Sequence, residues 1–177
     1  MSEKYKIFPD GLYFVTMTTV GWIDVFTRSA YCDEIIKNLN YCIDNKGLKV
    51  FAFCIMPSHI HFIAKADEGI NLSDVLHDFK SYAAKRLLKM IEESETESRR
   101  EWLLYMFEFY GKKNAHNAKY QFWQHNNYAF DLFSNKFIDQ KVDYIHNNPV
   151  EARIVTEPHF YIYSSANEFT DLKLAKL

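Results

Sequence analysis

Apolar and β-branched residues gather in three short runs in the first part of the chain. The runs are residues 11–20 (GLYFVTMTTV), 48–56 (LKVFAFCIM) and 59–66 (HIHFIAKA). Runs of this length and composition are typical of β-strands. Only Pro57 and Ser58 separate the second run from the third, so these two strands are expected to form an antiparallel pair.

Three other stretches place their apolar residues at the three- and four-residue spacing of helices. Residues 29–45 show this spacing in the first stretch. Residues 73–91 carry an apolar stripe at four-residue steps, and Ser73 is expected to cap that helix. Residues 135–148 form the third predicted helix, and Pro149 is expected to end it because proline cannot continue a helix.

The segment from residue 92 to residue 119 differs in composition from its surroundings. It contains the charge run EESETESRR, the amphipathic stretch EWLLYMFEFYG and the polar stretch KKNAHNAK. We predict a helical elaboration here. No repeat divides the chain, and 177 residues suit one domain with a sizeable core. Residues 1–177 are therefore expected to form a single domain that includes this elaboration.

The composition is that of an ordinary soluble globular protein, with 48% apolar and 25% charged residues. No apolar run approaches the roughly 20 residues that span a bilayer. The first residues do not show the pattern of a signal peptide, so we expect a cytoplasmic protein. The three cysteines, Cys32, Cys42 and Cys54, lack C-x-x-C spacing. This pattern suits a reducing compartment and argues against disulfides or a thiolate zinc site.

The balance of charge limits the kinds of nucleic-acid binding that are expected. The chain has 21 Lys and Arg residues against 23 Asp and Glu residues, a formal net charge of -2. Nonspecific coating of nucleic acid draws its energy from the neutralisation of phosphates. The composition therefore argues against such coating, although it leaves room for a local basic groove.

Two histidines, His59 and His61, stand at the start of the third predicted strand. Side chains alternate between the faces of a strand, so both imidazoles should project to the same side. Neutral imidazoles are good ligands for divalent metals. The alternative is a pair with a purely structural role, and the motif alone does not separate the two interpretations.

The helix predicted over 135–148 presents a second set of polar groups. Phe137, Lys141, Tyr144 and Asn148 follow at steps of four, three and four, so they share one face. Two imidazoles and an amide oxygen would suit a divalent metal that polarises a phosphoryl oxygen. A tyrosine can attack a phosphodiester once its proton is lost, and a nearby cation such as Lys141 favours that loss. The alternative to a catalytic role for any one of the 12 tyrosines is a role in packing.

Five further residues are candidates for contact with DNA. Lysines one turn apart on a helix can grip phosphates, and the alternative for each is a plain solvated surface. An aromatic ring and an amide can stack on or hydrogen-bond to an unpaired base, and the alternative is a core position. The candidates are Lys80, Lys85, Lys89, Trp123 and Gln124.

Four motifs occur in a fixed order: FCIMPSHIHFIAK, LHDFKSYAAKRL, FWQHNN and QKVDYIHNNPVEARIV. This ordered set resembles the single-tyrosine transposases of the HUH nuclease superfamily, and most of all the REP-associated tyrosine transposase branch of the IS200-like transposase family. The resemblance covers about residues 11–166. It implies an α+β fold with a ferredoxin-like (RRM-like) antiparallel sheet and helices packed on one face.

The resemblance also implies an activity, which is the metal-dependent nicking and strand transfer of single-stranded DNA, usually next to a hairpin. The implied intermediate is a covalent 5'-phosphotyrosine, and the implied cofactor is Mg²⁺ or Mn²⁺. His59 and His61 match the two metal ligands of the family, Tyr144 matches its nucleophile, and Asn148 stands where relatives offer a third polar ligand. Relatives often have glycine at the position of Arg153, so a positive dihedral there would strain this chain.

Two other functions remain open from the sequence. One is a domesticated protein that binds DNA hairpins without cutting them, and the other is a small metal-dependent hydrolase in which water is the nucleophile. A homodimer is also open, since members of the superfamily complete their sites either within one subunit or with a partner.

Overall fold

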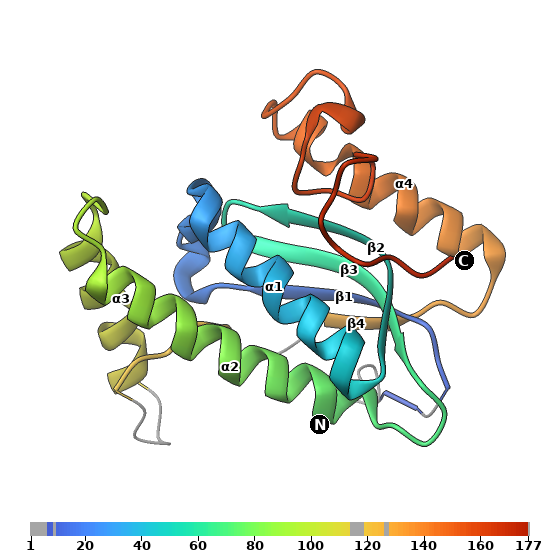
Figure 1. Ribbon diagram of the computed structural model, residues 1–177, viewed down its shortest axis with the longest axis horizontal. Helices are drawn as coiled ribbons and strands as arrows, with labels where there is room; N and C mark the ends of the chain where they lie inside the picture. Colours follow the sequence, from blue (N-terminus) through green and yellow to red (C-terminus); the bar gives the residue numbers. More distant parts are fainter. Residues whose placement is uncertain (1–6, 9, 114–118, 126–127, 177) are drawn as a thin grey trace.

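A four-stranded antiparallel sheet forms the centre of the molecule (Figure 1). The computed structural model describes residues 7, 8, 10–113, 119–125 and 128–176. Within them the strand order is β2-β3-β1-β4, and the strands are β1 (Tyr13–Thr18), β2 (Leu48–Met56), β3 (His59–Ala66) and β4 (Tyr128–Asp131). The two strands predicted over 48–56 and 59–66 are confirmed with the same bounds.

Helices cover both faces of this sheet. Figure 1 shows α1 and α2 side by side on one face, with α4 across the other. The chain order β1-α1-β2-β3-α2-β4 with this strand order is the ferredoxin-like arrangement, so the predicted α+β, ferredoxin-like fold is confirmed. The helix α4 is an addition on the opposite face. The helices are α1 (Ser29–Lys46), α2 (Leu72–Glu93), α3 (Arg100–Lys112) and α4 (Asn135–Glu151).

Alternation along the strands divides the apolar side chains between two cores. The larger core lies between the sheet and the pair α1 and α2, and it contains Val15, Phe62 and Phe79. The smaller core lies under α4 and contains Phe14, Ile63 and Ile145. Ile138, Val142 and Ile145 pack in this smaller core and hold α4 against the sheet, which sets the position of the neighbouring face of the helix.

Two predicted helix boundaries need correction. The cap of α2 is Asn71, whose side chain accepts a hydrogen bond from the backbone N–H of Ser73 at 2.9 Å. Pro149 does not end α4, which continues to Glu151. Pro149 has no N–H to donate to the carbonyl four residues earlier, so α4 lacks that one hydrogen bond in its last turn, while the proline ring is buried.

The helix α3 lies inside the segment that was predicted to form a helical elaboration, and residues 114–118 of that segment lie outside the described residues. The region Tyr161–Ser165 follows the outer edge of β2 as an irregular segment, with one isolated bridge between Cys54 and Ser164. The strand β4 was not evident from the local sequence pattern. In the described part of the chain, no helix has the length and apolar character needed to cross a membrane.

Candidate active site

The two histidines of β3 project toward α4. His61 pairs with Thr16 of β1, and His59 pairs with Thr18, so both side chains point to the face that carries the smaller core. Their ring centres are 4.6 Å apart. The predicted placement of both imidazoles on one face of a strand is therefore confirmed.

His61 is 5% exposed and its ring is fixed by neighbours from β1. Phe14 stacks on it with ring centres 5.3 Å apart, and the Thr16 hydroxyl lies 2.8 Å from Nδ1. Burial, with smaller contributions from His59 and Lys141, lowers the pKa of His61 to about 3, so the ring is neutral at physiological pH. Its other nitrogen, Nε2, is buried and has no hydrogen-bond partner among the described residues.

A buried polar atom without a hydrogen-bond partner costs free energy, and a ligand bound at Nε2 would offset that cost. If Nδ1 donates its proton to the Thr16 hydroxyl, the lone pair of Nε2 faces the site, which is how metal-binding histidines are usually oriented. Burial also lowers the pKa of His59, and the Ser58 hydroxyl lies 3.2 Å from its Nδ1. Both imidazoles therefore have the protonation state and the support that a divalent metal requires.

Tyr144 reaches the histidines from α4. Its ring centre is 5.3 Å from that of His61 and 5.9 Å from that of Phe14, and its side chain is 41% exposed. All of these residues belong to one chain, so both halves of the predicted site come together within a single subunit. Exposure of the tyrosine leaves room for a substrate from solvent.

Lys141 lies one turn before Tyr144 on the same face. Its ammonium is 5.2 Å from the ring centre of Tyr144 and 4.6 Å from that of Phe14. An ammonium group between the rings of Phe14 and Tyr144 can stabilise negative charge near the tyrosine oxygen or on a bound phosphate. The shared face of Lys141 and Tyr144, predicted from their spacing, is thus observed.

Asn148 follows Tyr144 by one further turn and is partly buried. Its Nδ2 donates a hydrogen bond to the backbone carbonyl of Tyr144 at 3.2 Å. Among the described residues, no cluster of three or more His, Cys, Asp and Glu side chains could hold a metal. A metal at His59 and His61 would therefore need further ligands besides these four residue types.

The structure contradicts one predicted DNA contact. Trp123 is 6% exposed, stacks on Phe26, and donates its indole N–H to the carbonyl of Lys80 at 3.1 Å. Its ring thus belongs to the larger core and offers no face to a base. The sequence could not reveal this, because an aromatic residue in a polar stretch is buried only when another element, here α2, covers it.

Lys80 and Gln124 connect α2, the segment that contains Trp123 and the end of β1. The Lys80 ammonium donates to the Gln124 carbonyl at 2.8 Å, and burial lowers the pKa of Lys80 to about 8. The Gln124 side-chain amide donates to the carbonyl of Thr19 at 3.2 Å. Both side chains therefore have structural contacts, and any contact with DNA stays a prediction.

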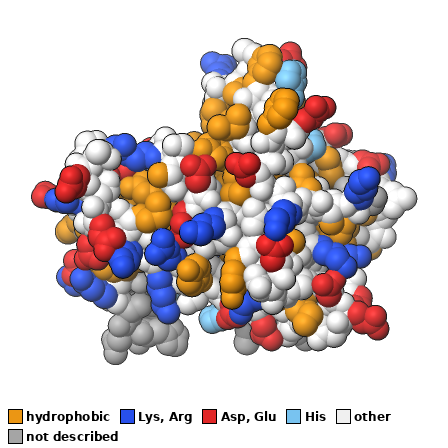
Figure 2. All heavy atoms as spheres, in the orientation of Figure 1, with side chains coloured by type: hydrophobic (Ala, Val, Ile, Leu, Met, Phe, Trp, Pro, Cys, Tyr) orange, Lys and Arg blue, Asp and Glu red, His pale blue; other side chains and the backbone are white. Residues whose placement is uncertain are grey.

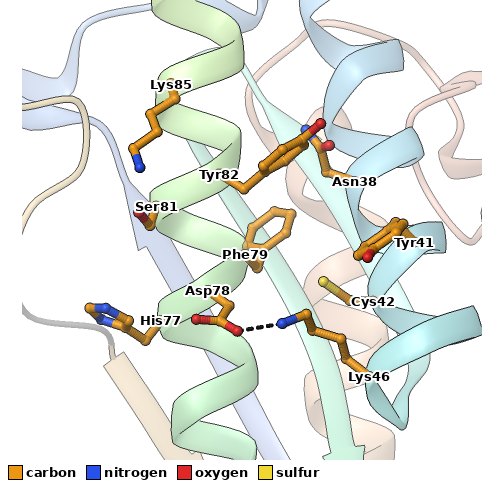
Figure 3. A pocket seen from close by; sticks show the side chains of 10 residues that line it. All are labelled: Asn38, Tyr41, Cys42, Lys46, His77, Asp78, Phe79, Ser81, Tyr82 and Lys85. Atoms are coloured by element: carbon orange, nitrogen blue, oxygen red, sulfur yellow. Dashed lines mark hydrogen bonds and ion pairs between the residues drawn. The ribbon is translucent and has the colours of Figure 1, made fainter.

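Lys85 and Lys89 are exposed on α2, in the helical layer on the other side of the sheet from His61. Lys85 borders a cavity of about 430 Å³ between α1 and α2 (Figure 3), and Lys89 lies 3.6 Å from Glu93. On this face basic and acidic side chains are interspersed (Figure 2). The solvated surface remains the alternative to phosphate contact for both lysines.

Arg153 adopts the backbone conformation anticipated at its position. Its φ is 58°, in the left-handed region that favours glycine, and its N–H donates to the carbonyl of Val150 at 2.9 Å. This turn ends α4 two residues after Glu151. The strain predicted for an arginine here is therefore present.

Four residues that contact the histidines were not among the predicted site residues, and one of them is Ser58, whose contact with His59 is described above. Thr16 and Phe14 lie on β1, and Trp22 contacts His59 with ring centres 5.5 Å apart. The alternating pattern places Phe14 and Thr16 on one face of their strand, but the register that sets them beside His61 depends on the strand order. Trp22 follows β1 in a turn, for which no sequence pattern predicted an orientation.

Comparisons with known proteins agree with this fold. The family model described as "Transposase IS200 like" matches residues 13–110, which is more than half of the chain. The protein therefore belongs to the IS200-like transposase family, and it is a transposase by family. No curated protein matches the sequence.

Two solved structures are similar in fold. One is a REP-associated tyrosine transposase bound to a REP hairpin, with 18% identity and a TM-score of 0.62 over 93% of this chain and 82% of that chain. The other is a suspected transposase from Deinococcus radiodurans, with 18% identity and a TM-score of 0.48 over 83% of this chain and 97% of that chain. The first likeness supports the ferredoxin-like fold.

Proposed function

We propose that this transposase nicks single-stranded DNA next to a hairpin and transfers the strand through a covalent 5'-phosphotyrosine at Tyr144. The observation that carries the proposal is the position of Tyr144 beside His61, whose buried Nε2 has no partner among the described residues. A nucleophile and a metal ligand set in contact can address the same phosphate. The DNA hairpin bound by the similar solved structure supports DNA of this kind as the partner.

In this proposal, the Tyr144 oxygen loses its proton to solvent and attacks the phosphorus. The bond from phosphorus to the 3'-oxygen breaks, and that oxygen takes up a proton to become a free 3'-hydroxyl. The new tyrosine–phosphate ester retains the energy of the linkage, so a second hydroxyl can displace the tyrosine and complete the transfer. Lys141 stabilises the negative charge that develops beside the ring.

His59, His61 and Asn148 are the proposed ligands of Mg²⁺ or Mn²⁺. Bound there, such an ion would act as a Lewis acid on a phosphoryl oxygen. Thr16 and Ser58 would keep the two imidazoles oriented through their Nδ1 atoms. Lys80, Lys85, Lys89 and Gln124 are proposed as contacts to more distant parts of the DNA.

The test is incubation with labelled single-stranded DNA from the hairpin flanks of its own gene, followed by denaturing electrophoresis. With Mn²⁺ the protein should form a protein–DNA adduct, and a chelator or Tyr144→Phe should abolish it. Tyr105→Phe, at another exposed tyrosine, is the matched control and should keep the adduct. Cutting that persists in Tyr144→Phe would indicate hydrolysis by water. Binding without any cut would indicate a non-cleaving hairpin-binding protein.

A further inference from the structure

Trp22 is an exposed aromatic residue at the border of the site. Its side chain is 62% exposed, yet its ring meets His59 edge to face with centres 5.5 Å apart. Its neighbours Val20 and Ile23 are both 3% exposed and anchor the turn in the larger core. Packing of Val20 and Ile23 in the core therefore explains the position of the turn. It does not explain why Trp22, which lies between them, has a large ring that is exposed to solvent.

The backbone of this turn is held in an unfavourable conformation. Trp22 has a φ of 55° and Gly21 has a φ of 59°, so two consecutive residues are left-handed. For a residue as large as tryptophan this costs of order 1–3 kcal/mol and persists only where surrounding contacts enforce it. Strained backbone of this kind is concentrated at functional sites, which indicates a role for the exposed ring of Trp22.

Contacts from both sides enforce the turn. The Thr19 N–H and hydroxyl both donate to the carbonyl of Ser58, at 3.0 and 2.9 Å, which joins the turn to the start of β3. On the other side Tyr110 of α3 lies so close to Gly21 that an added Cβ would be 2.5 Å from the tyrosine oxygen. The ring of Trp22 is thus carried on a rigid support next to His59.

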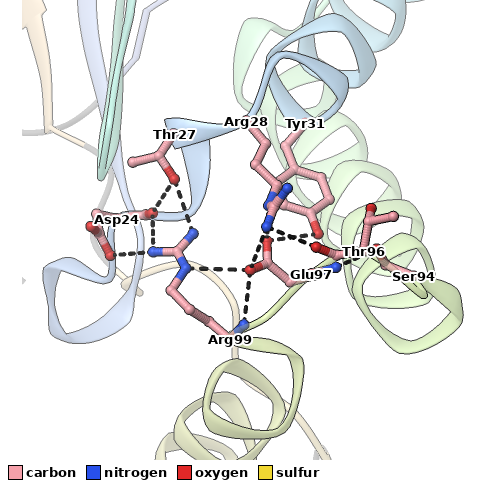
Figure 4. A network of polar contacts seen from close by, with 8 residues as sticks. All are labelled: Asp24, Thr27, Arg28, Tyr31, Ser94, Thr96, Glu97 and Arg99. Carbon is pink, nitrogen blue, oxygen red and sulfur yellow. Dashed lines mark hydrogen bonds and ion pairs between the residues drawn. The ribbon is translucent and has the colours of Figure 1, made fainter.

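A polar network extends this support (Figure 4). The Arg99 guanidinium donates to the Asp24 carboxylate at 3.0 Å and to the Thr27 hydroxyl at 2.9 Å. Glu97 in turn accepts from Arg99 and from Arg28. The segment that precedes α3 therefore fixes the residues immediately after Trp22, which gives the elaboration a role at the site.

We propose that Trp22 stacks on the unpaired base next to the phosphate that is cut. This inference rests on the proposed function and deepens it, because it names the part of the substrate that this surface recognises. A phosphate held at His59 and His61 places its neighbouring nucleotide over this border of the site. Aromatic rings on a rigid support are the usual means of binding unpaired bases, and each stacked base contributes about 1–3 kcal/mol.

The experiment measures binding without covalent attachment, in the Tyr144→Phe background with Mn²⁺, using a fluorescein-labelled single-stranded oligonucleotide from the hairpin flank. Trp22→Gly should weaken binding roughly 10- to 100-fold. Since glycine tolerates the left-handed backbone, this variant should melt no lower than its parent, so loss of folding does not explain the loss of binding. Trp22→Phe should retain most of the affinity, and Trp102→Ala, at a 46% exposed tryptophan of α3, is the control.

A scan of abasic nucleotides along the same oligonucleotide identifies the base. One abasic position next to the cut should weaken binding by the parent as much as Trp22→Gly does, and should weaken the glycine variant no further. Equal binding by Trp22→Gly and Trp102→Ala, or additive losses at every position, would overturn the stacking proposal. Adduct formation by the wild-type protein is scored separately, so failure of the nicking proposal is distinguishable from failure of this one.

Discussion

At the scale of single residues, the site consists of a few side chains whose neighbours fix their chemistry. His61 owes its neutral state to burial and its orientation to Thr16, while Tyr144 stays open to solvent. The spacing in the sequence placed the histidine pair on one face of a strand and the tyrosine on one face of a helix, and the resemblance of the ordered motifs to a known family indicated their roles. The sequence could not indicate Thr16 or Trp22, because their closeness to the histidines depends on strand register and on a left-handed turn.

Removal of the Thr16 hydroxyl should weaken metal binding. Thr16→Val keeps the shape of the side chain but loses the partner of His61 Nδ1, so the imidazole can turn or adopt the other tautomer. We expect Mn²⁺ affinity, measured by calorimetry, to fall about 10- to 100-fold. Thr16→Ser keeps a hydroxyl and should bind nearly as well as wild type. Equal affinity of the Val and Ser variants would contradict this role.

Relief of strain at Arg153 should stabilise the protein. Arg153→Gly removes a Cβ from a left-handed residue and should raise the free energy of unfolding by about 1 kcal/mol. A chain of this size should then melt roughly 2–4 °C higher in calorimetry. Arg153→Ala removes the charge but keeps the Cβ, and it should show no gain. If the Ala variant gains as much as the Gly variant, the charge and not the backbone is the cause.

At the scale of elements, the site depends on how α4 packs on the sheet and on how α3 packs beside the turn of Trp22. The helix α4 packs its apolar stripe on the sheet, and that packing delivers Tyr144 and Lys141 to His61 and Phe14. The helix α3 and the segment before it hold the turn of Trp22. The helical spacing in the sequence predicted both elements, but the face of the sheet on which α4 lies was beyond the local pattern.

Glu97 should be the main polar support between these elements. Its side chain is fully buried and accepts hydrogen bonds from the Arg28 side chain and the Arg99 backbone. Glu97→Gln should lower the free energy of unfolding by roughly 2 kcal/mol, since the arginines lose their charged partner. Urea unfolding measures this loss. The exposed Glu95→Gln in the same segment is the matched control and should change little.

The same residue should contribute to stability in a pH-dependent way. Burial raises the pKa of Glu97, but the Arg99 N–H and the two guanidiniums lower it by more, so its folded pKa lies below 4.5. Its contribution is therefore complete above pH 4.5 and is lost as the pH falls through the folded pKa. Wild type and Glu97→Gln should converge in stability in acid. A gap that stays constant down to low pH would argue against this assignment.

At the scale of the whole molecule, the sheet separates two helical layers with different roles. One layer, α1 and α2, forms the larger core and a surface of mixed charge, and the other brings α4 onto the histidines. The strands and helices of the first half were predictable because their patterns are local and strong. The burial of Trp123 and the continuation of α4 past Pro149 were not predictable, because both depend on packing between the layers.

Mass spectrometry of the trapped adduct determines whether Tyr144 becomes covalently joined to DNA. Wild-type protein would be incubated with Mn²⁺ and hairpin-flanked single-stranded DNA, then digested with nuclease and protease. We expect a 5'-phosphonucleotide on the peptide that contains Tyr144, with a free 3'-hydroxyl on the released strand. A nucleotide on a different tyrosine, or cut DNA without any modified peptide, would contradict it.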